Sequence, residues 1–406
     1  MTANIGQGLR KNWKQFSLLV IINGFVGAMV GLERTILPEI AEADFSIAAK
    51  TAILSFITVF GISKALSNYY AGAMADRTGR RKLLIIGWII GLPVPLILML
   101  APNWNWIIFA NILLGINQGL AWSSTVVMKI DLVGEKNRGL AMGLNESAGY
   151  LAVGISAFLT GYIASHYGLR PFPFYMGVGF AIVGLISSIF FLDDTSHHVA
   201  HESSTSSLPL SKNVFVDTTW KDPNLGSVSQ AGLVNNLNDA MIWGLLPILL
   251  ASLNFNLIEI GKIVAVYPAV WGISQMLTGP LADRVSKKLL ITLGMISQGF
   301  AILLFVYSHS FWHFVILSIL LGIGTAIVYP TFMASISDNV HPQQRAKSIG
   351  VFRLWRDLGY TVGAILVGLI SDIFSIDTAI LEIGILTLIS GLIVAFRMKN
   401  PGHIRS

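Results

Sequence analysis

Twelve long apolar stretches dominate this sequence of 406 residues. A transmembrane helix needs about 20 mostly apolar residues to cross the hydrocarbon core of a bilayer. Charged residues make up only 12% of the chain, about half of what soluble domains carry, so much of the surface is expected to face lipid. We predict an all-α membrane protein with twelve transmembrane helices. Their expected ranges are 16–38, 51–74, 83–101, 105–130, 139–165, 173–192, 229–252, 257–281, 289–308, 311–336, 347–371 and 376–397.

The distribution of basic residues indicates how the chain crosses the membrane. An even number of spans places both termini on one side, and short cytoplasmic segments are enriched in Lys and Arg. Of the 27 Lys and Arg residues, 19 fall in segments on the side of the termini, whereas three (Lys50, Arg170 and Lys262) fall in the opposite loops. We therefore expect a multi-pass protein of the plasma membrane, the inner membrane in a bacterium, with both termini in the cytoplasm.

One long segment between spans divides the chain. Residues 194–228 contain several Ser and Pro residues and no sustained apolar run, which is typical of a linker. We predict an N-terminal six-helix bundle (1–193), a cytoplasmic linker (194–228) and a C-terminal six-helix bundle (229–406). Because one chain contains both bundles, we expect it to function as a monomer. The basic residues lie at membrane borders, so the lipid bilayer rather than nucleic acid is the expected partner.

Short segments occur twice in the sequence at the same interval. Asp283 lies 207 positions after Asp76, in a similar Gly-x-x-x-Asp-Arg context, and Asp338 lies 207 positions after Asp131. A common interval in two separate loops indicates an internal duplication. Each half therefore has six spans in the same order and orientation, which is the parallel-repeat architecture of one large class of transporters.

The first of these segments resembles the loop between helices two and three of the major facilitator superfamily. The matching residues are Gly72, Asp76, Arg77, Gly79, Arg80 and Arg81. The second copy, with Asp283 and Arg284, matches more loosely, since Ser286 replaces the second glycine. The resemblance implies two bundles related by a pseudo-twofold axis, transport by alternating access, and a role for the loop as a cytoplasmic gate. Topological anchoring by the basic residues is the alternative role for the loop.

Ionisable and strongly polar side chains lie within several predicted spans. Such side chains are costly in a bilayer and are functional hypotheses by default. All of them lie on spans that the resemblance implies to line or border a central cavity. The alternative is a set of buried ion pairs that lock the bundle, for instance Asp357 with Lys64. The candidates for substrate binding or coupling are Glu33, Arg34, Lys64, Glu146, Asn235, Asn238, Asp239, Arg353, Arg356 and Asp357.

The cations among these candidates favour an anionic solute. Arg side chains match carboxylate and phosphate groups with two parallel hydrogen bonds, and Arg353 and Arg356 are expected on one face of their helix. The buried carboxyl groups, above all Asp239 and Glu146, are candidates for proton exchange during the cycle. We expect a secondary active transporter, a symporter or an antiporter, that moves a small polar, charged organic solute and couples this movement to protons.

Two other functions stay open at this stage. The first is a proton-driven efflux pump for amphipathic drugs or a secreted metabolite. Exporters of this kind in the family carry an arginine three residues before a Gln-Gly pair and a Gly-Pro motif in helix five. Here Gly115 precedes Gln118 in place of that arginine, and the second motif is absent at Ala152 and Val153. The other function is that of a transporter-like sensor or scaffold, which would bind solute without moving it.

We expect no enzymatic activity, no cofactor and no metal site. The chain has no cysteine, which excludes thiol catalysis and Cys-based metal sites. The sequence contains no nucleotide-binding glycine loop, so ATP-driven transport is not expected. His197, His198 and His201 form a cluster in the predicted linker, where a solvated segment is the expected structure.

Overall fold

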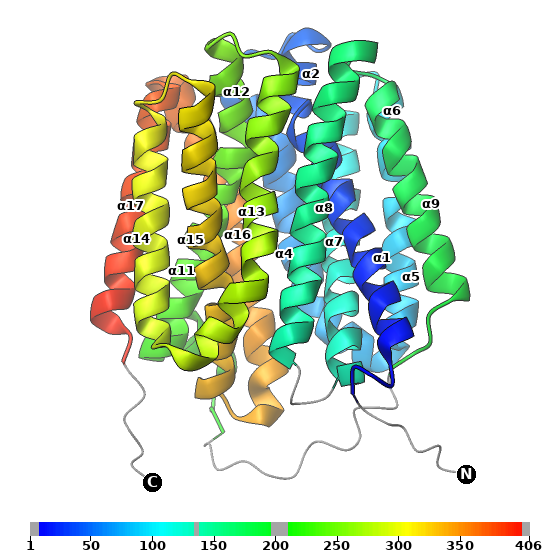
Figure 1. Ribbon diagram of the computed structural model, residues 1–406, viewed down its shortest axis with the longest axis vertical. Helices are drawn as coiled ribbons and strands as arrows, with labels where there is room; N and C mark the ends of the chain where they lie inside the picture. The colour runs from blue at the N-terminus through cyan, green and yellow to red at the C-terminus, as the bar shows by residue number, and fades with distance from the viewer. Residues whose placement is uncertain (1–7, 134–137, 196–209, 400–406) are drawn as a thin grey trace.

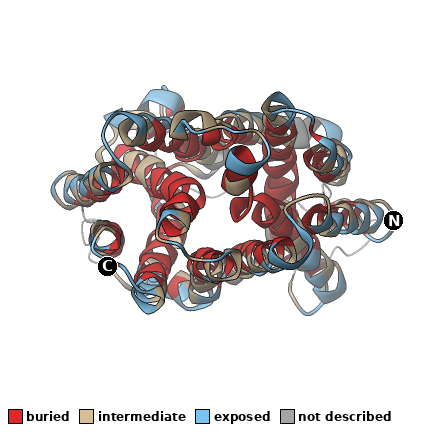
Figure 2. Ribbon diagram, turned by 90° about the horizontal axis from the view of Figure 1, so that it is seen from above, coloured by how far each residue is buried: buried red, intermediate tan, exposed pale blue. Residues whose placement is uncertain are grey.

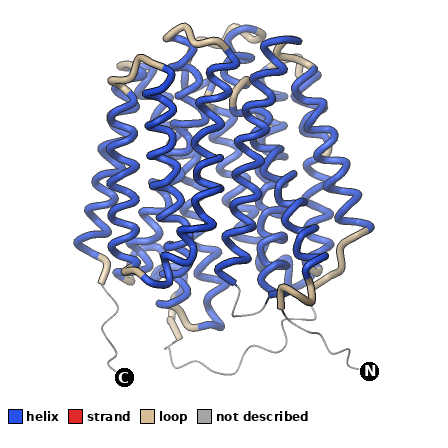
Figure 3. Tube along the Cα trace, viewed as in Figure 1, coloured by secondary structure: helices blue, strands red, loops and turns tan. Residues whose placement is uncertain are grey.

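The computed structural model describes residues 8–133, 138–195 and 210–399, and within these ranges it contains helices and loops but no strand (Figure 3). The helices run side by side as one bundle, and α1 begins at the same end of the bundle at which α17 ends (Figure 1). We call this the lower end and the opposite one the upper end, as drawn in Figure 1. The helices of the first half are α1 (Trp13–Arg34), α2 (Leu37–Ala43), α3 (Lys50–Ile53), α4 (Ser55–Thr78), α5 (Arg80–Gly91), α6 (Pro93–Leu100), α7 (Trp104–Val133), α8 (Arg138–Tyr167), the 3₁₀ turn η2 (Phe172–Phe174) and α9 (Tyr175–Phe190).

The second half repeats this arrangement with its own kinked first span. Two π-helical segments, η4 and η5, occur in this half. Its helices are α10 (Val214–Val216), η4 (Asp217–Lys221), α11 (Pro223–Ala240), η5 (Met241–Leu245), α12 (Leu246–Ser252), α13 (Leu257–Arg284), α14 (Lys287–Phe305), α15 (Phe311–Asn339), α16 (Pro342–Ile373) and α17 (Ile376–Arg397).

The twelve predicted spans correspond to these helices, because several spans, among them 16–38, 83–101 and 229–252, are divided into consecutive helices. Prolines in the first turn of the following helix (Pro38, Pro93 and Pro247) accompany these breaks, since proline lacks the N–H that would continue the helix. Ten helices or kinked helix pairs of the described residues are long and apolar enough to cross a membrane. The other two spans, α4 and α16, are equally long but carry charged side chains midway. The all-α, twelve-span architecture is confirmed.

The seventh span begins earlier than the apolar pattern indicates. Asp222 accepts hydrogen bonds from the amides of Asn224 and Leu225, and Pro223 occupies the first turn, so capping starts α11 six residues before the predicted position 229. The cluster of His197, His198 and His201 lies outside the described residues. The division of the chain at residues 193 and 229 stays a prediction.

Each half packs its first span against its fifth through a glycine. A Cβ on Gly27 of α1 would lie 2.1 Å from the carbonyl oxygen of Gly149 in α8, and a Cβ on Gly359 of α16 would lie 2.2 Å from that of Leu233 in α11. Small residues allow helix backbones to approach this closely in a membrane. The internal repeat of the sequence is therefore also a repeat of packing.

The two halves meet along two long helix pairs, α8 with α13 and α4 with α16, and the residues at the centre of the bundle are buried (Figure 2). At the upper end the backbones are in close contact. A Cβ on Gly161 would lie 2.9 Å from the Leu257 oxygen, and one on Gly368 would lie 2.7 Å from the Thr51 Cα. At the lower end a Cβ on Gly143 would have its nearest neighbour at 3.5 Å. The interface is thus tighter at its upper end.

Candidate solute site

A small cavity lies midway along the bundle, between the two halves. Its volume is about 20 Å³, which is room for a water molecule but not for an organic solute, so the bundle is closed around it. Helices α4, α7 and α8 of the first half and α15 and α16 of the second supply its walls. The lining residues are Lys64, Asn68, Trp122, Glu146, Tyr150, Tyr329, Arg353, Arg356 and Asp357. Five of the ten predicted site residues are therefore brought together here.

A chain of hydrogen bonds joins the halves at this cavity. Arg353 Nη1 donates to Ser123 Oγ at 2.8 Å, and Ser123 donates to Asn68 Oδ1 at 2.5 Å. Asn68 Nδ2 in turn donates to Asp357 Oδ2 at 2.5 Å. The chain leaves α16 of the second half, crosses α7 and α4 of the first, and returns to α16. Separation of the halves would break two of these bonds.

Arg356 is the charged partner of Asp357. Its Nη1 lies 3.2 Å from Asp357 Oδ1, its Nη2 donates to the Tyr150 hydroxyl at 3.1 Å, and its Cζ lies 4.5 Å from the centre of the Tyr329 ring. Asp357 also accepts a bond of 3.4 Å from Asn236. The sequence-based alternative that paired Asp357 with Lys64 is wrong, since the neighbouring arginine and two asparagines occupy its oxygens.

Lys64 has no such partner. Its Nζ makes no hydrogen bond or ion pair with the described residues, although the side chain is only 7% exposed. It lies instead 5.1 Å from the ring centre of Tyr360, 5.5 Å from that of Phe60 and 5.7 Å from that of Trp122. Cation–π contacts of this kind attract an ammonium group without using its N–H donors. Lys64 therefore presents a cation with free donors to the cavity.

Glu146 lines the cavity and also joins a polar cluster within the first half. Its Oε1 accepts hydrogen bonds of 2.9 Å from Trp122 Nε1 and from Asn145 Nδ2. Lys129, completely buried, donates to Asn145 Oδ1. Glu146 Oε2 has no hydrogen-bond partner in the described part of the chain. One oxygen is thus fixed, and the other is left without a partner among the described residues.

Glu33 and Arg34 lie above the cavity, and both are fully buried. The two side chains form a long ion pair, with Arg34 Nη1 3.7 Å from Glu33 Oε1. Asn111 Nδ2 donates to the other oxygen of Glu33 at 3.1 Å. These two residues are therefore not part of the central cavity in this conformation.

The polar residues of α11 point in different directions. Asp239 accepts a bond of 2.5 Å from the hydroxyl of Tyr267, and Asn238 bonds with Gln298 and Thr387 inside the second half, away from the cavity. Asn235 is buried without a hydrogen-bond partner among the described residues. Asn235, Asn238 and Asp239 therefore do not meet at one site in this structure.

The first copy of the repeated loop, between α4 and α5, makes defined contacts at the lower end of the bundle. Gly79 precedes α5 with φ of 85°, a conformation that favours glycine. Arg80 forms an ion pair of 3.1 Å with Asp131, and Arg81 Nε donates to the Ser188 oxygen at 3.3 Å. Thr195 also donates to Asp131. The first copy thus ties α5 to the lower ends of α7 and α9.

The second copy repeats this contact. Lys287 lies 2.6 Å from Asp338, and these residues are 207 positions after Arg80 and Asp131. Gly72, Asp76, Arg77, Asp283 and Arg284 lie within helices α4 and α13, but their side chains are outside the described part of the structure. Their predicted roles in gating stay predictions.

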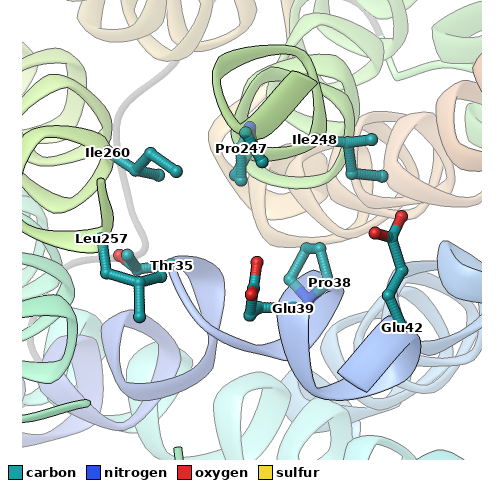
Figure 4. Close-up of a pocket in the computed structure, with 9 residues that line it drawn as sticks. Thr35, Pro38, Glu39, Glu42, Pro247, Ile248, Leu257 and Ile260 are labelled. Carbon is teal, nitrogen blue, oxygen red and sulfur yellow. The ribbon is translucent and has the colours of Figure 1, made fainter. Parts of the chain in front are cut away.

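A second, smaller cavity lies at the upper end, with a volume of about 10 Å³. Figure 4 shows Glu39 of α2 pointing into the space between α2 and Pro247 of α12, with Ile260 of α13 on the far side. Thr35 and Glu42 also line the cavity, together with apolar residues that include Ile248 and Leu257. This cavity marks the seam along which the halves meet at the upper end.

Sequence reasoning missed the neutral half of the central site. Asn68, Ser123 and Tyr150 carry the hydrogen bonds of the arginines and Asp357, and Tyr360 contacts Lys64. One signal was available, since Asn68 lies four residues after Lys64 and shares its helix face. Tyr150 and Tyr360 match a position of the internal repeat, and the structure places both near the seam.

Known proteins agree with this architecture. The profile of the Major Facilitator Superfamily matches residues 17–225 and 228–406. Multidrug resistance protein MdtG of Salmonella choleraesuis (strain SC-B67) is 23% identical over 378 residues, which covers 89% of each chain. MdtG of Salmonella typhi is also 23% identical over 378 residues, with the same coverage.

Two solved structures share the fold. A POT family transporter in complex with a thioalcohol-conjugated peptide superposes with a TM-score of 0.75 at 14% identity, over 93% of this chain and 95% of that one. The human organic anion transporter MFSD10 (TETRAN) gives a TM-score of 0.70 at 16% identity, over 94% of this chain and 99% of that one. At these identities the likeness concerns the fold alone. Together with the family match over nearly the whole chain, it shows that this protein belongs to the Major Facilitator Superfamily and is a secondary transporter.

Proposed function

We propose that this protein transports small organic anions, with the central cavity as their binding site. The supporting observation is the charge of that cavity. Lys64, Arg353 and Arg356 face Glu146 and Asp357, and neither Lys64 nor Arg353 has a carboxylate within 4 Å among the described residues. Two cations are therefore available to a carboxylate or phosphate group of a solute.

The aromatic rings in the cavity wall favour a solute with an apolar body. Trp122 and Tyr150 lie with ring centres 5.2 Å apart, and Tyr150 stacks on Trp271 across the seam between α8 and α13. Such rings bury apolar surface and accept edge or stacking contacts. An organic anion with an apolar body suits this site better than an inorganic ion.

We further propose that the lower end faces the cytoplasm of a bacterial cell and that transport is coupled to protons. The excess of Lys and Arg in the segments at the lower end supports this orientation, and the bacterial relatives support the compartment. Glu146, with one oxygen free and the other fixed, is the carboxyl group best placed to exchange a proton beside the bound anion. Because the site lies between the two halves of one chain, a monomer suffices for function.

Ligand-dependent thermal stability of the purified protein tests the anion site. Benzoate and succinate represent anions, and tetraphenylphosphonium represents lipophilic cations. A ligand that binds only the folded state stabilises it by about 2.7 kcal/mol at a hundredfold excess over its dissociation constant. We expect stabilisation by at least one anion and its loss in Lys64→Gln, a change that breaks no hydrogen bond. Lys262→Gln, on the exposed start of α13, is the matched control.

A second function has support of its own, namely efflux of amphipathic compounds. The curated relatives are multidrug resistance proteins, and the site has the aromatic walls that such compounds need. Stabilisation by tetraphenylphosphonium alone, unaffected by Lys64→Gln, would favour this function over anion transport. Anion binding without any flux in proteoliposomes would instead indicate a sensor.

A further inference from the structure

Arg34 is a buried cation enclosed by aromatic rings, above the central cavity. Its side chain is 0% exposed. The guanidinium carbon lies 4.7 Å from the ring centre of Phe60, 5.0 Å from that of Trp243 and 5.6 Å from that of Phe56. Phe56 and Phe60 belong to α4 of the first half, whereas Trp243 belongs to η5 of the second half. The guanidinium therefore lies on the seam between the halves.

None of the nitrogen atoms of Arg34 makes a hydrogen bond to a described residue. Among the described residues, the one carboxylate within 4 Å of Arg34 is that of Glu33, at 3.7 Å, which is too long for a hydrogen bond, and Asn111 already binds the other Glu33 oxygen. A guanidinium group offers five N–H donors in a planar fork. A buried donor without an acceptor is destabilising, so a conformation that supplies an acceptor would be favoured at this residue.

Phe60 separates Arg34 from the central cavity. The same ring lies 4.7 Å from Arg34 and 5.5 Å from Lys64. Tyr360 packs against Phe60 with ring centres 5.6 Å apart and stacks on Trp243 at the same distance. These three rings form a partition, with Lys64 on the cavity side and Arg34 in contact with the partition on the upper side.

Opening of the upper end would change the surroundings of Arg34 most on one side. In alternating access the halves move as bodies about the central site, so Phe56 and Phe60 would stay with α4 while Trp243 moves away with η5. The π-helical turn η5 is itself a feature often found at functional sites. One face and one edge of the guanidinium would then border the space that opens at the upper end.

We propose that Arg34 forms a second anion-binding site, which receives the carboxylate of a small organic anion when the upper end is open. Phe56 and Phe60 would contact the apolar body of the solute beside it. The anion would pass from Arg34 to Lys64 once the partition of Phe60, Tyr360 and Trp243 opens, and would follow the reverse path in the other direction. This proposal rests on the proposed anion transport and adds a second binding site for the anion at the upper end.

A glycine at the upper seam allows the open state to be held for the test. Gly161→Leu places a side chain where a Cβ already approaches the Leu257 oxygen to 2.9 Å and Thr35 Cγ2 to 3.1 Å, so the upper end cannot close fully. Binding of radiolabelled benzoate and succinate is measured in the unmodified protein and in Gly161→Leu, each with and without Arg34→Gln. Arg170→Gln is the matched control, because Arg170 pairs with Asp44 at the upper surface, away from the seam.

We expect Arg34→Gln to weaken binding at least tenfold in the Gly161→Leu protein and less than twofold in the unmodified protein, with Arg170→Gln close to neutral in both. An unchanged affinity in the Gly161→Leu protein would overturn the proposal and make Arg34 a structural residue. An equal loss in both proteins would also overturn it, because Arg34 would then act on the central site.

The two proposals fail in different ways. If the unmodified protein binds neither probe but Gly161→Leu binds one through Arg34, the central anion site is wrong and the upper site stands. If neither protein binds either probe, both proposals are wrong. Circular dichroism and monodisperse gel filtration of each variant ensure that lost binding is not lost folding. Arg34→Lys, which keeps the charge but not the fork, should recover part of the affinity at the upper site.

Discussion

The upper seam and the central cavity contain the same kinds of charged residue in opposite settings. Arg34 at the upper seam has three aromatic rings and no hydrogen bond among the described residues, whereas Arg356 at the cavity binds Asp357 and the Tyr150 hydroxyl. The upper seam closes by backbone contact at Gly161 and Gly368, and the centre closes by side-chain hydrogen bonds through Asn68.

This difference indicates how the two regions open. A seam closed by apolar packing excludes water. Opening it exposes apolar surface to water, which costs a free energy of about 25 cal/mol per Å². Hydrogen bonds at the centre can be exchanged for bonds to water or to a solute at little net cost. A small solute can therefore disrupt the centre by supplying equivalent polar groups. The upper seam needs a larger change of the whole bundle.

The largest expected effect is on the ion pair of the cavity. Removing one partner of a buried ion pair costs about 3–5 kcal/mol, because the other charge stays buried without compensation. Arg356→Ala leaves Asp357 with two asparagine donors only. We expect a large fall in thermal stability and a loss of transport. The double variant Arg356→Leu with Asp357→Leu should regain most of the stability but no transport, and equal instability of both variants would contradict this account.

The next effect concerns the seam itself. A leucine at Gly161 overpacks a tight contact, for which about 1–3 kcal/mol is typical, whereas a leucine at Gly143 of the lower end has more room. The chain has no cysteine, so Thr35→Cys introduces a single thiol, at a buried position of the upper seam. We expect Gly161→Leu to raise the rate of maleimide labelling of this thiol several-fold. Gly143→Leu is the control and should leave the rate unchanged or lower it, and a rise there as well would remove the contrast between the ends.

The fold was predictable from the sequence, since it depends on properties that single residues carry. Apolar length determines a membrane span, and the interval of 207 positions between Asp76 and Asp283 revealed the duplication. Caps and proline breaks such as those at Asp222 and Pro247 were not anticipated, because they adjust the ends of helices within an otherwise correct plan.

The site was predictable only in part, because burial at membrane depth does not say what a charge touches. Lys64, Arg353, Arg356, Asp357 and Glu146 were found through their cost in a bilayer. Their partners are neutral residues that cost little anywhere and so carry no signal in a single sequence. The orientation of α11 about its own axis turns Asn238 toward the interior of its own half. Helical spacing alone cannot predict this orientation when a helix is buried on all sides.

A smaller effect separates the two copies of the repeated loop. The side chains of Arg80 and Asp131 are each 10% exposed, whereas Asp338, the partner of Lys287, is 52% exposed. Exposed ion pairs contribute about 0–1 kcal/mol, whereas removing one partner of a pair shielded from water leaves the other charge poorly compensated and costs more. Arg80→Gln should therefore lower thermal stability and slow transport more than Lys287→Gln does. Equal effects in the same assays would show that exposure does not set the strength of these contacts.

The smallest expected effect is that of pH on a contact at the upper surface. There, Asp372 of the second half accepts hydrogen bonds from the backbone amides of Lys50 and Thr51 of the first half, at 2.6 and 2.9 Å. Partial burial acts to raise the pKa of Asp372, but the hydrogen bonds from Thr51 and Lys50 and the charge of Lys50 outweigh it and hold this pKa below its usual value. The ionised form is therefore the one that favours closure. Its contribution is fully present above the usual pKa of about 3.9 and is lost as the pH falls through the lowered value.

Since the contact is largely exposed, we expect it to be worth about 0.2–1 kcal/mol, or at most a few-fold change in the population of the open upper end. Hydrogen–deuterium exchange of the Lys50 and Thr51 amides reports it directly, because these amides are the donors. Once the intrinsic pH dependence of exchange is removed, protection should be constant near neutral pH and should fall only below about pH 4, whereas Asp372→Asn should show weak protection throughout. Protection that falls already near pH 6 would assign the contact to another group and remove Asp372 from the closure of the upper seam.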